Sequence, residues 1–265
     1  MIMLALMVLP IVACLILAVI HAYLGLHVMT RGVIFVDLAL AQLAALGALV
    51  GYAVGWPFHT TGSYFFSLGF TVIGALFFAL TRHRNMRVPH EGIIGIVYAV
   101  SAAAAILILN AVPAEAEHLK DMLVGNLLFV DRPEVIKLAI LYGVIGLVHF
   151  LFRRRFWAVS RDTDTVSYAR VWDFLFYATF GVVVTSSVEI AGVLLVFAYL
   201  IIPSVCAFLV SDRMRMRLLV AWGVGISGSV IGILTSIRFD LPTGPAIICT
   251  LGSVVVIAGI FKCSG

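Results

Sequence analysis

Acidic and amide side chains interrupt long apolar stretches of this sequence, where they could line a path for a cation. Asp37 and Gln42 lie in one such stretch, Glu91 opens another, and Glu189 interrupts a third. Charge at membrane depth is costly unless it faces a bundle interior, a partner or water, so such residues are candidates for ion pathways. Asp37 and Gln42 are about 140° apart round a helix and share no narrow face. Asp37 is equally well interpreted as a path residue or as the structural partner of Arg31.

The other polar groups have strong structural interpretations. Ser186 and Glu189 have the S-x-x-E spacing of a capping box, which favours Glu189 as a helix cap. Glu91 stands where it would favour the positive N-terminus of a helix. His21 and His149 are expected to be core histidines rather than ligands.

A second group of possible metal ligands lies in predicted external loops. It contains His59 and, near one another, Glu115, Glu117, His118 and Asp121. Imidazole and carboxylate groups can attract divalent cations, although a solvated acidic loop is the favoured interpretation. The 4 cysteines lack the CxxC form of a zinc or redox site and are expected to pack as small apolar residues.

Motifs for resident chemistry are missing from the sequence. It has no GxxxxGK[ST], so it cannot hydrolyse nucleotide by a P-loop of its own, and neither HExxH nor GxSxG occurs. We therefore expect no enzyme activity and no cofactor bound by this chain. No basic run with interleaved aromatic residues lies outside the loops, so no nucleic-acid partner is expected.

The composition excludes an ordinary water-soluble domain. Hydrophobic residues make up 63% of the 265 positions and charged residues 11%, with a mean hydropathy of +1.17. Surface-to-volume scaling prevents a chain of this size from hiding so much apolar surface from water. The sequence predicts an all-α, polytopic transmembrane helix bundle in contact with membrane lipid. Its nine apolar stretches are 1–26, 33–55, 64–81, 92–112, 134–152, 172–187, 190–210, 217–237 and 244–261.

The basic residues predict which side of the membrane each loop occupies. Of the 17 Lys and Arg, one set of alternate loops holds only Lys120, Arg132, Lys137 and Arg238. Cytoplasmic loops are enriched in Lys and Arg, so nine spans place the N-terminus outside and the C-terminus inside. The basic segment 153–173 then lies in the cytoplasm, where we expect a short helix that either anchors the membrane topology or docks a soluble partner.

Four segments in order resemble the membrane permeases of ABC importers for zinc, manganese and chelated iron. They are HEGIIGIVYAVSAA at 90–103, HLKDMLVGNLLFV at 118–130, IAGVLLVFAYLIIPSVCAFLV at 190–210 and FDLPTGPA at 239–246. The resemblance covers nearly the whole chain and implies a single transmembrane permease domain over 1–265, in a bacterial plasma membrane.

The resemblance also implies partners and a mechanism. It implies a homodimer that binds two ATP-binding subunits, receives metal from an extracytoplasmic solute-binding protein and moves the metal by alternating access while ATP binds the partner subunits. The segment 153–173 would carry the coupling helix, for which the candidate contacts are Arg161, Asp162, Asp164 and Arg170.

One departure concerns the cargo. The family carries Gly-Asp-Ala-Leu-Ser-His in its second span, whereas residues 37–42 read Asp-Leu-Ala-Leu-Ala-Gln, so Leu38 and Gln42 stand in place of the family's Asp and His. Metal would then be bound through other residues, such as Asp37 with Glu91 or Glu189, or the cargo would be a chelate or a non-metal. Zinc or manganese is the expected metal, with iron as a further option. A transporter driven by an ion gradient and a membrane scaffold without transport are the other classes.

Overall fold

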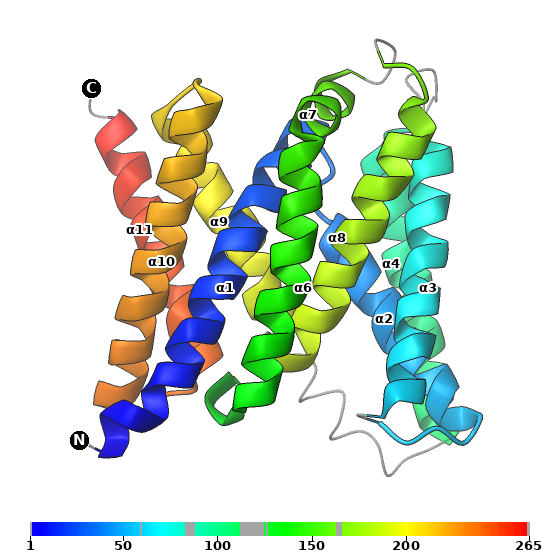
Figure 1. Ribbon diagram of the computed structural model, residues 1–265, viewed down its shortest axis with the longest axis horizontal. Coiled ribbons are helices and arrows are strands. Elements are labelled where there is room, and N and C mark those ends of the chain that lie inside the picture. Colours follow the sequence, from blue (N-terminus) through cyan, green and yellow to red (C-terminus); the bar gives the residue numbers. More distant parts are fainter. Residues whose placement is uncertain are drawn as a thin grey trace. The chain divides into compact units, whose positions relative to one another are not determined.

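The computed structural model describes residues 2–58, 60–82, 88–111, 125, 127–162 and 166–263, with the side chains of 2–6, 111 and 259–263 left out. These residues form ten α-helices and one short 3-10 helix, η2, and no strand (Figure 1). The chain divides into two compact units. Unit 1 comprises Met1–Met29, Leu123–Val148 and Glu189–Gly265, and unit 2 comprises Thr30–Met122 and His149–Val188.

Unit 1 is built on a three-helix packing of α9, α10 and α11. Its elements are α1 (Ile2–Arg31) up to residue 29, η2 (Leu127–Phe129), α6 (Arg132–Leu151) up to residue 148, the end of α8, α9 (Val193–Val210), α10 (Met214–Phe239) and α11 (Thr243–Cys263). Close backbone contact joins α1 to α9, because a Cβ on Gly25 would lie 2.0 Å from the carbonyl oxygen of Leu200. Only glycine permits that approach.

Unit 2 is centred on α2, which packs against both α3 and α4. Its elements are the end of α1, α2 (Val36–Ala53), α3 (Thr61–Thr81), α4 (His90–Ala111), the end of α6, α7 (Arg153–Arg161) and α8 (Ala169–Ala191) up to residue 188. A buried hydrogen bond of 3.0 Å between the hydroxyls of Thr71 and Thr185 joins α3 to α8.

The nine predicted apolar stretches all correspond to helices, but one predicted boundary is wrong. The sequence places a helix start at Ser186 and Glu189, whereas α8 continues through both residues to Ala191. The Ser186 hydroxyl donates to the carbonyl oxygens of Val182 and Val183 in the preceding turn, so it does not cap a helix start. The break falls at Gly192, whose φ of 76° is open to glycine without strain.

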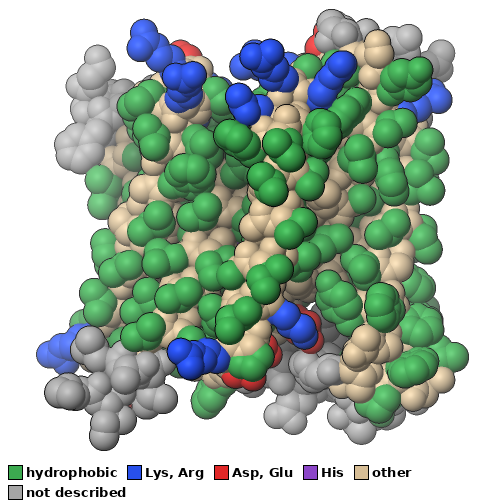
Figure 2. Space-filling model, in the orientation of Figure 1, with side chains coloured by type: hydrophobic (Ala, Val, Ile, Leu, Met, Phe, Trp, Pro, Cys, Tyr) green, Lys and Arg blue, Asp and Glu red, His purple; other side chains and the backbone are tan. Residues whose placement is uncertain are grey.

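The helices have the length and the exposed surface of membrane spans. Among the residues with described side chains, eight helices are long and apolar enough to cross a membrane, and Thr243–Ala258 of α11 forms a shorter apolar helix. Exposed apolar side chains follow one face of α6, at Ile136, Ile140, Val144 and Leu147. Apolar side chains cover the middle of the face seen in Figure 2, and Lys and Arg side chains lie near its edges. Such a distribution suits hydrocarbon flanked by water.

Candidate functional site

Asp37 lies in the first turn of α2 and is buried, with 2% of its surface exposed. Negative charge is favoured at this position because the free N–H groups at the start of a helix carry partial positive charge. The Oδ1 atom of Asp37 has no hydrogen-bond partner among the described residues. Because an unpaired buried oxygen is costly, this carboxyl group is suited to bind a proton or a cation.

Glu91 lies in the first turn of α4 and caps a neighbouring helix. Its Oε1 accepts a hydrogen bond of 2.9 Å from the backbone N–H of Phe35, the N-cap residue of α2, whose own side chain provides no cap. Oε2 is buried and has no partner in the described part of the chain. The carboxyl groups of Glu91 and Asp37 are close enough to interact electrostatically. The structure therefore brings these two predicted path residues together at the start of α2.

The other two predicted path residues lie elsewhere. Gln42 is half-buried, further along α2. Glu189 is exposed in the last turn of α8 and belongs to unit 1. Among the described residues no group of three or more His, Cys, Asp and Glu side chains could hold a metal ion. Metal binding at Asp37, Gln42, Glu91 and Glu189 thus stays a prediction.

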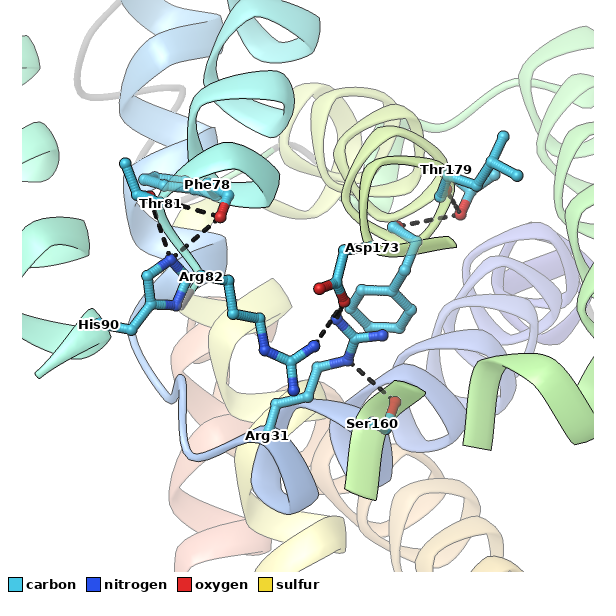
Figure 3. Close-up of polar contacts among 10 residues, drawn as sticks. Arg31, Phe78, Thr81, Arg82, His90, Ser160, Asp173 and Thr179 are labelled. Carbon is cyan, nitrogen blue, oxygen red and sulfur yellow. Dashed lines mark hydrogen bonds and ion pairs between the residues drawn. The ribbon is translucent and has the colours of Figure 1, made fainter. Parts of the chain in front are cut away.

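Arg31 pairs with Asp173, so of the two interpretations of Asp37 the structural pair with Arg31 is wrong. The Nη1 atom of Arg31 donates to Oδ1 of Asp173 at 2.6 Å, and Nη1 of Arg82 donates to the same oxygen at 2.5 Å. The side chain of Arg31 has 0% exposure and that of Asp173 has 2%. Figure 3 shows both guanidinium groups pointing toward this carboxylate. We call Arg31, Arg82 and Asp173 the charge cluster.

The charge cluster lies against aromatic side chains. The guanidinium carbon of Arg31 is 3.8 Å from the ring centroid of Phe176 and 5.3 Å from that of Tyr177. Arginine stacks favourably on aromatic faces because its flat cation is weakly hydrated. His90 is fixed close by, with its Nε2 atom 3.1 Å from the carbonyl oxygen of Phe78. The ends of α1 and α3 and the start of α8 therefore meet at one end of unit 2.

The basic segment after α6 contains the predicted short helix, α7. One face of α7 is buried through Phe156, Val159 and Ser160, while Arg153, Arg154 and Arg155 are exposed. Of the candidate coupling residues, Arg161 and Arg170 are exposed and Asp162 is half-buried. Asp164 lies outside the described residues. The helix α7 is therefore amphipathic, with one buried face and an exposed basic face.

The two histidines predicted to be core residues, His21 and His149, lie in the core. His21 is fully buried, with Nδ1 2.8 Å from the carbonyl oxygen of Leu17, and its Nε2 has no partner among the described residues. His149 is 1% exposed, with Nε2 2.9 Å from the hydroxyl of Thr179. The loop candidates, His59, Glu115, Glu117, His118 and Asp121, lie outside the described residues.

The sequence analysis did not identify Asp173 as a buried acid or Arg82 as one of its partners. Asp173 is the second residue of the predicted stretch 172–187, so an acid inside that stretch could have been noticed. Its partner Arg31 is 142 residues away in the chain, and spacing along a helix cannot reveal such a pair.

Long apolar helices with buried ionisable residues define a polytopic membrane protein of a transport type. The family model described as the ABC 3 transport family matches residues 3–262, so the chain belongs to this family. It is a membrane permease subunit of an ABC transporter and not itself an enzyme, because ATP hydrolysis in such transporters belongs to a separate subunit. It is a multi-pass integral protein of the bacterial plasma membrane.

Relatives extend over most of the chain. The chain is 26% identical over 245 residues to the chelated iron transport system membrane protein YfeC of Yersinia pestis, covering 91% of this chain and 80% of that protein. It is 24% identical over 256 residues to the manganese transport system membrane protein MntC of Halalkalibacterium halodurans, covering 94% and 85%. PsaBC from Streptococcus pneumoniae, solved in complex with Fab, shares the fold, with a TM-score of 0.77 and 19% identity over 96% of this chain and 90% of that one.

Proposed function

We propose that this chain is the membrane subunit of an ATP-driven importer for a divalent transition metal, with manganese and iron as the foremost cargoes and zinc as a further option. The observation that carries the proposal is the family match over residues 3–262, together with relatives named for manganese and chelated iron transport. Membership of an ABC family also favours ATP over an ion gradient as the source of energy.

The proposed assembly has two copies of this chain and two ATP-binding subunits, with a solute-binding protein outside. ATP binds the partner subunits, and this chain needs no resident cofactor. Nine spans cross the membrane with the N-terminus outside, which puts the basic end of unit 2 in the cytoplasm. The exposed arginines of α7, including Arg161, and the exposed Arg170 then face the ATP-binding subunits. Asp162 and Asp164 are further candidate contacts for those subunits.

We place the proposed cargo path at Asp37 and Glu91, beside the start of α2, with Gln42 further along the same helix. Glu189, in unit 1, is kept as a separate candidate for cargo binding. Support comes from the unpaired buried carboxylate oxygens of Asp37 and Glu91. The carboxylates of Asp37 and Glu91 are hard oxygen ligands, which suit manganese better than a soft metal. Weak ligation also suits a permease, because a cargo that binds tightly would not be released.

A chelated cargo is the second candidate. The specific observation in its favour is Gln42, which stands where the family carries His. An amide that donates and accepts hydrogen bonds can contact the polar atoms of a chelate without binding the metal directly.

The proposal is tested by elemental analysis of cells under metal limitation. Cells that lack this protein, wild-type cells and complemented cells are compared for manganese, iron and zinc together. A selective fall in one metal, restored by complementation, is the expected result and names the cargo. Equal contents of all three metals in all three strains would contradict metal import.

A further inference from the structure

The short helix α7 cannot hold its position by itself. It has nine residues, and isolated helices shorter than about 12 residues are only marginally stable in water. Its place in unit 2 therefore depends on the groups that anchor it. They include apolar and aromatic contacts of Phe156 and a polar contact of Ser160, which lies one turn further along the same buried face.

The apolar contacts of α7 keep its buried face against unit 2 but do not fix how the helix is rotated about its axis. Phe156 is 1% exposed and stacks on the His149 ring with centroids 4.1 Å apart, and it also meets the Trp172 ring edge to face at 5.6 Å. Hydrophobic burial is non-directional, so such a contact tolerates rotation and sliding of the helix. A directional bond is needed to fix the register of α7.

Arg31 supplies that directional bond. Its Nε atom donates to the hydroxyl of Ser160 at 2.9 Å, while its Nη1 atom donates to Asp173. The guanidinium group is planar and rigid, so a carboxylate that holds one edge also aims the N–H groups of the other edge. Figure 3 shows Arg31 between Ser160 of α7 and Asp173 of α8. Asp173 thereby determines where Arg31 meets α7.

The same carboxylate also holds α3. Arg82, the C-cap residue of α3, donates to the Oδ1 atom that Arg31 uses. Breaking the buried ion pair between Arg31 and Asp173 is costly, because the charge that remains is buried without an opposite charge beside it. A displacement of α7 that keeps the Ser160 bond therefore carries Arg31 with it, together with the helix ends that share Asp173.

We infer that Asp173 is a positioning residue for coupling: through Arg31 it sets the register of α7 and transmits movements of α7 to α1, α3 and α8. The inference rests on the proposed function, because it takes α7 as the helix that contacts the ATP-binding subunits. It adds an internal link through the buried side chains of Ser160, Arg31 and Asp173.

The direct test measures the order of α7 in the permease alone. The 4 native cysteines are replaced by alanine, and a spin label is attached at Arg154→Cys on the exposed side of α7. Ser160→Ala and Asp173→Asn are compared with Ser187→Ala, a control in which a buried serine of unit 2 donates to Val183 of its own helix. We expect higher label mobility in the first two variants and unchanged mobility in the control.

The functional readout is the amount of ATP hydrolysed per metal ion imported by the reconstituted transporter. Ser160→Ala should raise this ratio about fivefold, to which the loss of one hydrogen bond of about 1 kcal/mol converts. Asp173→Asn should raise it further, while Ser187→Ala should leave it unchanged.

Three results overturn the inference. The first is unchanged label mobility in Ser160→Ala and Asp173→Asn. The second is a change of label mobility in the control Ser187→Ala as large as in those two variants. The third is a wild-type ratio of ATP hydrolysed to metal imported in Ser160→Ala and Asp173→Asn proteins that fold. If Asp173→Asn does not fold, Ser160→Ala decides alone. If the wild-type protein imports no metal, the proposed function fails, and label mobility still decides whether the charge cluster positions α7.

Discussion

Unit 1 and unit 2 bury different kinds of polar group. In the described part of unit 2, Arg31, Asp37 and Asp173 are buried charged side chains, and the charge cluster joins the ends of several helices. In the described part of unit 1, the buried polar residues are hydroxyl residues and histidines, and its ion pair between Arg217 and Asp212 involves an exposed carboxylate. Unit 1 is held by close backbone packing, whereas unit 2 also depends on compensated charge.

Buried charge, and not close backbone packing, distinguishes the units, because a Cβ on Gly47 of unit 2 would also lie only 2.6 Å from the carbonyl oxygen of Phe66. Buried charge costs more than apolar packing and is retained where a specific geometry or an ion path requires it. Unit 2 therefore has the groups expected of a path and of a link to α7. Unit 1 has the close contacts expected of a rigid helix packing, such as that of Gly25 against Leu200.

The largest expected effect comes from breaking the charge cluster. Asp173→Ala leaves two guanidinium groups without their shared carboxylate and should cost about 3–5 kcal/mol of stability. Asp212→Ala removes the exposed acid of the unit 1 pair and should leave stability unchanged. Thermal unfolding in detergent measures both variants. Equal unfolding temperatures for the two would remove the proposed distinction between the units.

The next effect comes from the close packing of unit 1. Gly25→Ala places a Cβ against the backbone of α9 and should cost about 1–3 kcal/mol. Gly143→Ala is the matched control, because a Cβ there meets nothing within 4 Å. The same unfolding measurement should show a loss for Gly25→Ala alone. A Gly25→Ala protein as stable as the wild type would argue against backbone packing as the basis of unit 1.

A smaller effect separates two helix caps. Glu91→Ala removes the cap that α4 supplies to α2 and should cost about 0.5–2 kcal/mol. Glu134 of α6 caps its own helix, since its Oε2 accepts from the backbone N–H of Asp131 at 3.0 Å. Hydrogen exchange should show faster opening of α2 in Glu91→Ala than of α6 in Glu134→Ala. Equal protection would mean that the long-range cap adds nothing beyond a local one.

The smallest effect concerns hydroxyl pairs, in which the units should not differ. Thr71→Val removes the Thr71–Thr185 pair of unit 2, and Ser229→Ala removes the 2.7 Å bond to Tyr199 in unit 1. Hydrogen bonds between membrane helices contribute about 0.6 kcal/mol on average, so both variants should lose a similar amount in thermal unfolding. A much larger loss in unit 2 would extend its dependence on polar contacts from charges to neutral groups.

The helices could be predicted from sequence because each is a long apolar run, and the lipid solvent requires such runs to be helical. The break between α8 and α9 could not be placed, because serine hydroxyls were satisfied within α8 and the backbone of Gly192 set the boundary. A capping box with both of its hydrogen bonds lies instead at the start of α6. The side chains of Asp131 and Glu134 each accept a hydrogen bond from the backbone N–H of the other residue.

The candidate site was only partly predictable. Asp37 and Glu91 stood out because an acid in an apolar stretch is unusual, and the structure places them together. The alternative that Asp37 pairs with Arg31 came from their nearness in the chain, and it is wrong because folding brings Asp173 to Arg31. Long-range pairs depend on how helices pack, which spacing along one helix does not encode.

The most direct test is uptake of radioactive manganese and iron by cells that carry Asp37→Ala, Asp37→Asn or Asp212→Ala. The three variants are compared at equal amounts of the permease in the membrane. If Asp37 belongs to the cargo path, both Asp37 variants lose uptake while still assembling with the ATP-binding subunit. The Asp212→Ala variant transports metal as the wild type does. Wild-type uptake by the Asp37 variants would contradict the assignment of the cargo path to unit 2.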